Sequence, residues 1–503
     1  MLPPLFKHQQ DAIAFILFRP DGAGALYMDM GTGKTRTAIE VFKWRRNENP
    51  ALKMIVIAPL SLLEGAWGPD IKAFSSFTYY NAHDRVLPLS TIDGRCAFRE
   101  DILLINYEGI IQAKNKHLRY HVMNNLLVLD ESSRMKSPKT QTTEMLLSFA
   151  ELAAFKIIMS GTPAPNSPME YWAQMEFLQK GLLGVSNSQF KNSFFYLSRG
   201  DQMVMEGGKA NPQFVVQMIN QKRITAAEGN LLLRGIVTRG IAGKIFAAGA
   251  EYRISDANLT KLMETIRPLV FWAKKEECLD LPEQIDEVRM VELTPAQARH
   301  YKEMKQDLIT EIKNCAITAP VALTKIMKLR EITSGFAIDV AGSEVSIEPG
   351  TPVKIRELED TLEDAGAVQV IIWACFKWDI RRIVAFLKDK YGAGSAVTLY
   401  SETKDHQGSI DDFREGKARF LVANPASAAH GLNLQFCHMQ IFFSLDYSWE
   451  RYIQGKGRIH RSGQKENCTY VHLIARGTID EEILKCLRDK GDINKVAYGL
   501  ISK

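Results

Sequence analysis

The stretch of sequence that decides the fold is Ala25-Leu26-Tyr27-Met28-Asp29-Met30-Gly31-Thr32-Gly33-Lys34-Thr35. It predicts a strand over 25–28, then a glycine-rich loop, then a helix that runs through 36–42. Backbone N–H groups of such a loop, at the start of a helix, form a natural anion site. We therefore expect this loop to bind the phosphates of ATP, with Lys34 on the β- and γ-phosphates and Thr35 on Mg²⁺. Met28 stands where the pattern prefers Gly, so a chance glycine-rich turn is the alternative.

Short apolar runs rich in β-branched residues alternate along the chain with longer amphipathic segments. This alternation is typical of βαβ units and predicts an α/β fold with parallel sheets. Most of the expected strands end in polar, Gly or Pro residues, and ligands of open α/β sheets bind at the carboxyl ends of the strands. The expected strands are 54–57, 102–105, 126–129 and 156–159 in the first half, and 370–373, 396–399, 420–422, 440–443 and 470–474 in the second.

A long stretch with few strand signals, about 165–365, separates the two groups of strands. The separation predicts two lobes, 1–265 and 266–503, with the boundary near 265–285. Residues 180–265 are expected to form a helical insertion. Further along, Thr294 and Gln297 predict the start of a helix, with Thr294 as the N-cap and Gln297 closing a capping box.

An acidic pair, Asp130-Glu131, follows the expected strand at 126–129. A buried strand that delivers two carboxylates to its carboxyl end suits metal-assisted hydrolysis. We expect Asp130 to hold Mg²⁺ through water, and Glu131 to orient or deprotonate the attacking water. A solvated strand end is the alternative, and the phosphate loop upstream favours the catalytic interpretation.

Two arginines near the end of the chain, Arg458 and Arg461, are three residues apart and therefore share one helix face. An Arg is always charged and can fork onto phosphate oxygens. An arginine of this kind can accelerate phosphoryl transfer by about 10³–10⁵. A solvated basic face is the alternative.

Taken in order, these residues resemble superfamily-two helicases, and most closely their SWI/SNF-type DNA translocase branch. The resemblance covers nearly the whole chain, and two departures stand out: Ser133 replaces a usual His, and Ala428-Ala429 replaces a Gly-Gly pair. The matching segments are 5–9, 31–35, 58–63 with Trp67, 106–108, 130–131, 160–163, 281–282, 293–297, 430–434, 454–464 and 478–483.

The resemblance implies two RecA-like lobes that bind ATP between them. It implies that Gln9 reads the adenine, and that Gln454 acts with Arg458 and Arg461 in the second lobe's catalytic motif. It also implies a nucleic-acid groove across both lobes, where exposed backbone and small side chains contact phosphates without reading bases. We therefore expect sequence-independent binding of duplex DNA. The expected groove residues are Pro59, Ser61, Asn106, Tyr107, Thr162, Gly431 and Asn433.

The composition of the chain limits which partners and which cellular location we expect. The 503 residues are 46% hydrophobic, and their formal net charge of +5 is compatible with a nucleic-acid partner without requiring one. We find neither an apolar run long enough to cross a membrane nor a secretory signal at the start. Seven scattered cysteines without a C-x-x-C pair argue against a disulfide framework or a zinc module, and favour a reducing cytoplasm. The small size and the absence of accessory modules favour a bacterial or phage-infected cell. A monomer is expected, with any targeting left to protein partners or to residues 180–265.

Three functions stay open at this point. The first is a DNA-stimulated ATPase that translocates on duplex DNA, and the second is a strand-separating DNA or RNA helicase. The helicase needs a wedge, for which Phe194-Phe195-Tyr196 is the candidate, although core packing is the simpler interpretation of these aromatic residues. The third is a catalytically inactive nucleic-acid clamp, which the intact catalytic motifs disfavour.

Overall fold

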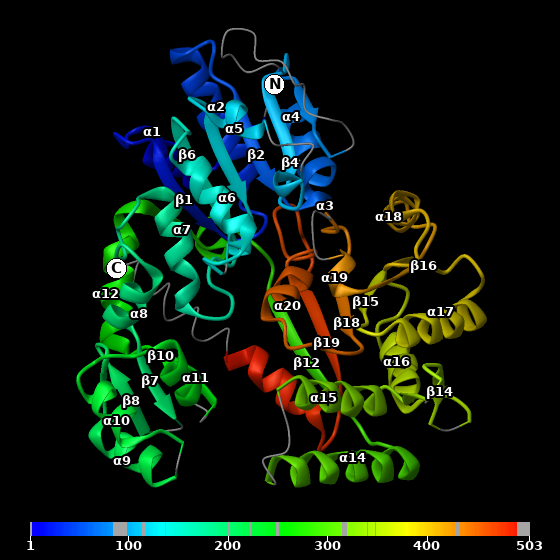
Figure 1. Ribbon diagram of the computed structural model, residues 1–503. Helices are drawn as coiled ribbons and strands as arrows, with labels where there is room; N and C mark the ends of the chain where they lie inside the picture. The colour runs from blue at the N-terminus through cyan, green and yellow to red at the C-terminus, as the bar shows by residue number, and fades with distance from the viewer. Residues whose placement is uncertain are drawn as a thin grey trace.

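The structure is a computed structural model that describes residues 3–83, 98–112, 117–135, 137–199, 202–221, 223–247, 251–313, 319–339, 341–347, 349–428 and 433–489. Two parallel sheets, each covered by helices on both faces, form the two lobes (Figure 1). The predicted α/β fold with two lobes is therefore confirmed. Among the described residues, no helix is both long and apolar enough to cross a membrane.

The first sheet has the strand order β11-β1-β6-β5-β2-β4-β3, and every neighbouring pair is parallel. Its strands are β1 (Ala23–Met28), β2 (Met54–Ala58), β3 (Tyr79–Asn81), β4 (Ile102–Asn106), β5 (Leu126–Asp130), β6 (Phe155–Ser160) and β11 (Val270–Ala273). All the strands predicted for this half are present. The edge strand β11 comes after residue 265, within the region where the sequence places the boundary between the lobes, and the exact division stays a prediction.

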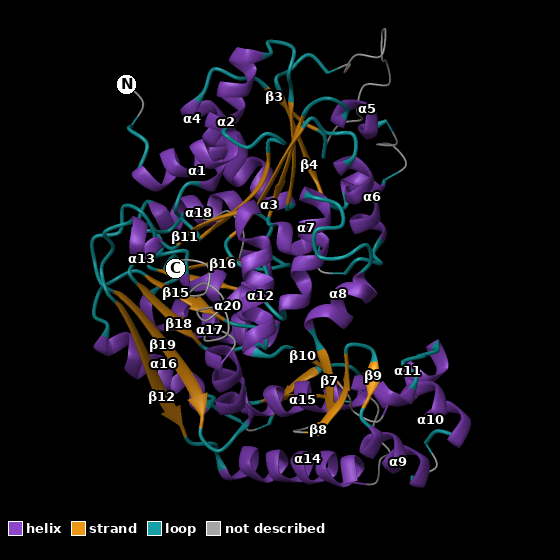
Figure 2. Cartoon of the chain, turned by 90° about the vertical axis from the view of Figure 1, so that its left-hand side faces the viewer, coloured by secondary structure: helices purple, strands orange, loops and turns teal. Residues whose placement is uncertain are grey.

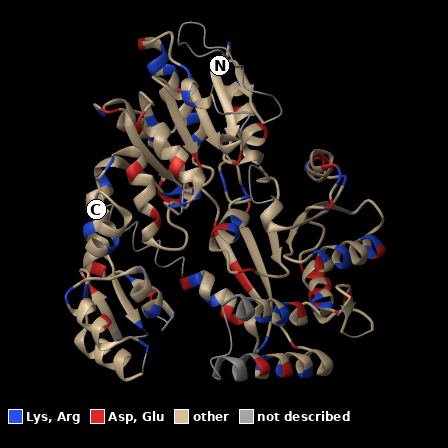
Figure 3. Cartoon of the chain, in the orientation of Figure 1, with Lys and Arg blue, Asp and Glu red and all other residues tan. Residues whose placement is uncertain are grey.

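Helices cover both faces of this sheet because its central strands are apolar on both sides, as parallel strands usually are. One face packs against α1 (Lys7–Leu17), α2 (Lys34–Glu48) and α4 (Gly68–Phe74). The other packs against α5 (Leu118–Val122), α6 (Gln141–Ala150), α7 (Tyr171–Leu178) and α12 (Asp256–Ile266). Charged residues accordingly lie mainly on helices and loops, and the strands of this sheet are mostly uncharged (Figure 3).

The insertion predicted at 180–265 is not only helical. Besides its helices it contains a four-stranded antiparallel sheet, in the order β10-β7-β8-β9, with a hydrophobic core of its own (Figure 2). The strand signals here are short and interrupted by glycine, which is why the sequence pattern did not reveal them. Its elements are α8 (Asn187–Phe194), β7 (Tyr196–Arg199), β8 (Gln202–Glu206), β9 (Lys209–Ala210), α9 (Pro212–Asn220), α10 (Ala226–Leu233), α11 (Arg239–Ala247) and β10 (Glu251–Arg253).

A short linker containing α13 (Lys275–Cys278) leads from β11 to the second lobe. There a helical hairpin, α14 (Pro295–Lys313) and α15 (Ala319–Thr333), precedes a two-stranded sheet of β13 (Phe336–Ile338) and β14 (Glu344–Ser346). The capping box predicted at the start of α14 is confirmed. The backbone N–H of Gln297 donates to Thr294 Oγ1, and the Thr294 N–H donates to Gln297 Oε1, each at 3.2 Å.

The second sheet has the order β12-β19-β18-β15-β17-β16, and its neighbouring strands are again parallel. It contains all the strands predicted for this half, and also β12, which pairs along its whole length with β19. Its strands are β12 (Gln284–Val291), β15 (Val370–Trp373), β16 (Ala396–Leu399), β17 (Phe420–Ala423), β18 (Met439–Phe442) and β19 (Cys468–Ala475). Its helices are α16 (Val353–Asp364), α17 (Lys377–Tyr391), α18 (His406–Arg414), α19 (Pro425–Ala428), α20 (Trp449–Lys456) and the helix at 479–489.

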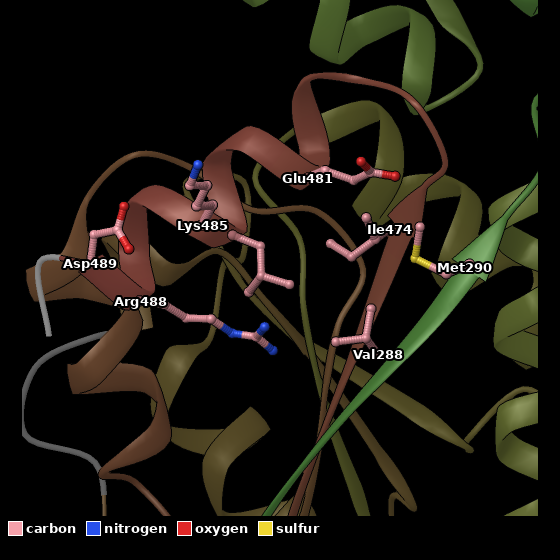
Figure 4. Close-up of a pocket in the computed structure, with 8 residues that line it drawn as sticks. Val288, Met290, Ile474, Glu481, Lys485, Arg488 and Asp489 are labelled. Carbon is pink, nitrogen blue, oxygen red and sulfur yellow. The ribbon is translucent and has the colours of Figure 1, made fainter. Parts of the chain in front are cut away.

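A hollow of about 460 Å³ lies between β12, β19 and the helix at 479–489 (Figure 4). Its floor is apolar and its rim carries both signs of charge. None of the residues predicted to bind ATP or nucleic acid lines it, so it is not part of the predicted site. The lining residues are Val288, Met290, Ile474, Glu481, Leu484, Lys485, Arg488 and Asp489.

Candidate functional site

The topology of the first sheet brings the phosphate loop and the acidic pair to the same edge. Strand β6 lies between β1 and β5, pairing Ser160 with Tyr27 on one side and Met159 with Asp130 on the other. Because all three strands are parallel, their carboxyl ends meet there. The loop that follows β1, the Asp130-Glu131 pair and Ser160 are therefore neighbours, as the sequence predicts.

The phosphate loop takes the conformation that its glycines allow. Gly31 and Gly33 have φ angles of 84° and 86°, which residues that carry a side chain rarely adopt. Gly33 forms the N-cap of α2, so the first free N–H groups of this helix lie beside the loop. A Cβ at Gly33 would lie 2.0 Å from Gln9 Nε2, so a larger residue there would also displace the Gln9 side chain.

Hydrogen bonds fix the loop from within. Lys34 Nζ donates to the carbonyl oxygens of Met28 and Asp29, at 2.8 and 3.2 Å, and Thr32 Oγ1 donates to Asp29 O at 2.7 Å. The Met28 position, where the sequence pattern prefers Gly, thus contributes its carbonyl oxygen to holding Lys34. Thr35 is half-buried beside Lys34 at the start of α2.

The predicted adenine-reading residue, Gln9, is buried against the same loop. Its Nε2 donates to Thr32 O at 3.1 Å, and its Oε1 accepts from the Phe6 N–H at 3.0 Å. The ring of His8 also hydrogen-bonds Thr32 O, at 2.8 Å. The structure therefore shows Gln9 supporting the phosphate loop, and its contact with adenine stays a prediction.

The acidic pair is buried and held in place. Asp130 Oδ2 accepts from Trp67 Nε1 at 2.9 Å, and Oδ1 accepts from the Glu131 N–H at 3.0 Å. Ser160 Oγ donates to Glu131 Oε2 at 3.4 Å. Glu131 has φ = 54°, a left-handed conformation that a residue with a side chain adopts at some cost and that is concentrated at functional sites.

Burial raises the pKa of both carboxyl groups. It brings the pKa of Glu131 to about 7, and the nearby charge of Asp130 adds to the rise, while Lys34 and Arg458 oppose it. Burial also raises the pKa of Asp130, against the opposing effects of Lys34 and of the hydrogen bond from Trp67. A carboxyl group whose pKa lies near neutral pH can both accept and release a proton under working conditions.

The second lobe supplies Arg458 and Arg461 through the turn that follows α20, so the prediction that they share one helix face is wrong: the helix ends at Lys456, with Gly457 as its C-cap. This segment, residues 457–461, is called the arginine turn below. Glu131 is among the charges that act on Arg458, whose pKa is lowered chiefly by burial. Asp70, on α4, is the charge that acts on Arg461. Both predicted arginines therefore interact electrostatically with carboxylates of the first lobe.

Packing shows directly that the two predicted halves of the site meet. A Cβ at Gly31 would lie 2.8 Å from the Cβ of Arg461, and a Cβ at Gly457 would lie 3.2 Å from Met30 Sδ. The phosphate loop and the arginine turn are in van der Waals contact. Gln454 lies on α20 with 1% of its surface exposed, and neither of its amide atoms hydrogen-bonds to a described residue.

The residues predicted for the nucleic-acid groove divide into two sets. Ser61 and Asn433 are exposed. Asn106, Tyr107 and Thr162 are buried, as is Pro59. Tyr107 donates its hydroxyl to Asp130 O at 2.8 Å, so it supports the acidic pair instead of presenting its side chain to a groove. Gly431 lies outside the described residues.

Of the aromatic residues considered as a wedge at 194–196, Phe194 and Phe195 are 6% and 4% exposed and belong to the core of the first lobe, and Tyr196 is half-buried. Both phenylalanine rings pack on Phe190. The simpler interpretation of core packing is confirmed for these two residues.

Two residues of the site were not predicted in their roles. Trp67 holds Asp130, and Asp70, three residues later, faces Arg461. Burial raises the pKa of Asp70 to about 6, with Arg461 opposing. The signal was present in the sequence as an acidic residue three positions after a tryptophan near a strand end, but only the fold places both beside Asp130.

Comparison with known proteins gives two family matches. The SNF2-related domain matches residues 8–335, and the helicase conserved C-terminal domain matches residues 353–463. "Putative protein p41" of Acyrthosiphon pisum secondary endosymbiont phage 1 is 25% identical, over 92% of this chain and 91% of the phage protein. "Putative ATP-dependent helicase/translocase YwqA" of Bacillus subtilis is 24% identical, over 98% of this chain but only 49% of its own length.

Among solved structures, the Sulfolobus solfataricus SWI2/SNF2 ATPase core in complex with dsDNA is 23% identical, with a TM-score of 0.42 and coverage of 99% of this chain and 94% of that one.

Proposed function

Since the chain belongs to the SNF2-related family of helicase-type ATPases, we propose that it couples ATP hydrolysis to translocation along duplex DNA. The observation that carries the proposal is the contact between the phosphate loop and the arginine turn at Gly31 and Arg461. A nucleotide bound there touches both lobes, so hydrolysis can change how the lobes sit relative to each other. Movement of two lobes that both grip DNA is what translocation requires.

The residues present fit Mg²⁺, a hard cation that prefers carboxylate, hydroxyl and phosphate oxygens. Thr35 and the buried Asp130 would hold it, and it would neutralise charge on the phosphates. Asp130 already has an N–H donor on each oxygen, which fixes the direction of its carboxylate.

Different residues of the chain then carry out different parts of ATP hydrolysis. Lys34 compensates phosphate charge within the loop, and Glu131 orients the attacking water and accepts its proton. Arg458 and Arg461 stabilise the negative charge that develops on the transferred phosphoryl group. Gln454, buried on α20 without a described hydrogen-bond partner, is available to the nucleotide or to the water.

Two observations bear on the choice between translocation and strand separation. The name of the Bacillus subtilis relative includes translocase as well as helicase. Phe194 and Phe195, two of the three candidate wedge residues, are in the core.

The test is an ATPase assay with duplex DNA, single-stranded DNA and RNA, together with displacement of a third strand from a triplex. We expect duplex DNA to stimulate hydrolysis, third strands to be displaced, and a plain fork to be unwound little. Stimulation should be independent of sequence and should weaken steeply with salt, as phosphate contacts require. Stimulation by RNA or single strands alone, with duplex DNA inert, would replace this proposal with the helicase alternative.

A further inference from the structure

The linker between the lobes, residues 274–283, is the covalent connection between the two sheets. It begins where β11 ends at Ala273 and stops where β12 begins at Gln284. Since β11 pairs with β1, which leads into the phosphate loop, and β12 pairs with β19, the linker joins an edge strand of each sheet. Its contacts are therefore able to relate one half of the nucleotide site to the other.

At its first end the linker is tied to the phosphate loop. The backbone N–H of Asp29 donates to Ala273 O at 2.9 Å. The backbone N–H of Lys275 in turn donates to Asp29 Oδ2 at 3.1 Å. Asp29 directly precedes the loop, so the position of Lys275 is fixed relative to it.

The side chain of Lys275 reaches the other half of the site. Its Nζ donates to the carbonyl oxygen of His460 at 3.1 Å. The ring of His460 donates from Nε2 to Pro282 O, further along the linker, at 2.9 Å. His460 lies between Arg458 and Arg461, so the linker holds the arginine turn at two points.

The electrostatic surroundings agree with this geometry. The pKa of Lys275 is lowered chiefly by burial, and the charges of Arg461 and Lys34 lower it further, while Asp29 raises it. The ammonium group thus lies among the same charged groups that would surround the nucleotide phosphates. Two hydrogen bonds, one from its backbone and one from its side chain, connect this single residue to both lobes.

We propose that Lys275 is a positioning residue that holds the arginine turn against the phosphate loop. The proposal rests on the ATPase function proposed above, and it assigns to Lys275 no contact with the nucleotide. Its effect on hydrolysis passes through Arg458 and Arg461.

The test compares Lys275→Met, which keeps the length of the side chain but removes its donor, with Lys275→Arg and Lys274→Met. Lys274 is the matched control because its ammonium pairs with Glu277, within the linker, at 4.0 Å. We expect Lys275→Met to lower kcat by about tenfold to a hundredfold with little change in KM for ATP, because small displacements of catalytic groups are costly. Lys275→Arg should recover part of the loss, and Lys274→Met should match the unmodified protein. An unchanged kcat in Lys275→Met would overturn the proposal.

A triple variant separates positioning from direct contact with phosphate. If Lys275 acts through the arginine turn, Lys275→Met should cost little further activity in a background with both Arg458→Ala and Arg461→Ala, because the effects share one step. Independent, multiplying losses would show that Lys275 contacts the nucleotide by itself, and would overturn the positioning role.

Amide hydrogen exchange gives a result that does not depend on catalysis. In the nucleotide-free full chain, residues 457–464 should exchange faster in Lys275→Met than in Lys274→Met, because one of their anchors is gone. Equal exchange of residues 457–464 in the two variants would overturn the inference, whatever their rates of ATP hydrolysis. A chain that shows the exchange difference but hydrolyses no ATP would instead refute the proposed function and leave the anchoring role supported.

Discussion

The two sides of the nucleotide site hold their polar groups in different ways. In the first lobe, Lys34 and Asp130 are fixed by hydrogen bonds within that lobe. In the second lobe, Gln454 has no described hydrogen-bond partner, and the arginine turn is anchored by the linker. The first side is therefore held within its own lobe, whereas the second is held both within its lobe, where the Leu434 N–H donates to Arg458 O, and by the linker. Substitutions on the first side should abolish ATP hydrolysis, and substitutions on the second side should slow it.

The largest effect should come from the first side. Glu131→Gln should reduce hydrolysis to background while nucleotide binding persists, because only the water-orienting carboxylate is lost. Lys34→Ala should also abolish hydrolysis, and should weaken binding as well, because the phosphates lose their countercharge. Steady-state ATPase assays and binding of a fluorescent nucleotide measure both quantities. Glu151→Gln, which alters an exposed pair with Lys180, is the control. Normal turnover in either site variant would refute the assignment of the pocket.

On the second side, Arg461→Ala should lower kcat by about 10³, with a smaller change in nucleotide affinity. The reason is that its charge acts mainly on the transition state. Arg451→Ala is a matched control, since Arg451 lies on α20 and pairs with Asp446 at 3.0 Å. A loss of affinity with kcat unchanged would mean that Arg461 binds ATP equally in the ground state and in the transition state, and the proposed role of its charge in the transition state would be refuted.

The pH dependence tests the first side alone. Glu131 must be deprotonated to accept a proton, so kcat/KM should fall by about tenfold per pH unit below about pH 7 and level off above it. The stability of the fold changes with pH in the opposite direction. Because burial raises the pKa of Glu131, its protonated carboxyl group stabilises the folded state at pH values below the ordinary pKa of a glutamate. This contribution is lost as the pH rises to about 7. Thermal unfolding over the same range therefore separates loss of activity from denaturation. A flat rate profile across pH 7 would contradict the role of Glu131.

The smallest effect should come from the support of the acidic pair. Trp67→Phe removes the N–H that donates to Asp130, which should raise the pKa of that carboxyl further and lower the rate about tenfold. Trp172→Phe is the control, because Trp172 is buried in the same lobe and its Nε1 has no hydrogen-bond partner among the described residues. If both variants lost the same activity, the effect would be one of packing.

The local pattern of apolar and polar residues was enough to predict most of the fold. Runs such as Leu126–Leu129 and Val370–Trp373 are apolar throughout, and both form central strands. The strands that the pattern missed are at edges, in the insertion or in the small second-lobe sheet: β3, β11 and β12 border their sheets, and β7 to β10, β13 and β14 are short. Edge strands are only partly covered, so their sequences need not be uniformly apolar, and β12 alternates charged and apolar residues.

By itself, the sequence determined the chemistry of the site: a glycine-rich loop before Lys34, carboxylates at the end of a buried strand, and two arginines three residues apart, although it placed these arginines on a helix and the structure places them on a turn. These signals are local, because a loop conformation, a strand end or a helix face depends on residues near in the chain. Only the tertiary structure decided which groups support them. Trp67 on Asp130, Tyr107 beneath the acidic pair and Lys275 on His460 are contacts between distant segments. They arise because parallel strands bring their carboxyl ends together and because the linker crosses between the lobes at that edge, and neither fact is written in any one stretch of the chain.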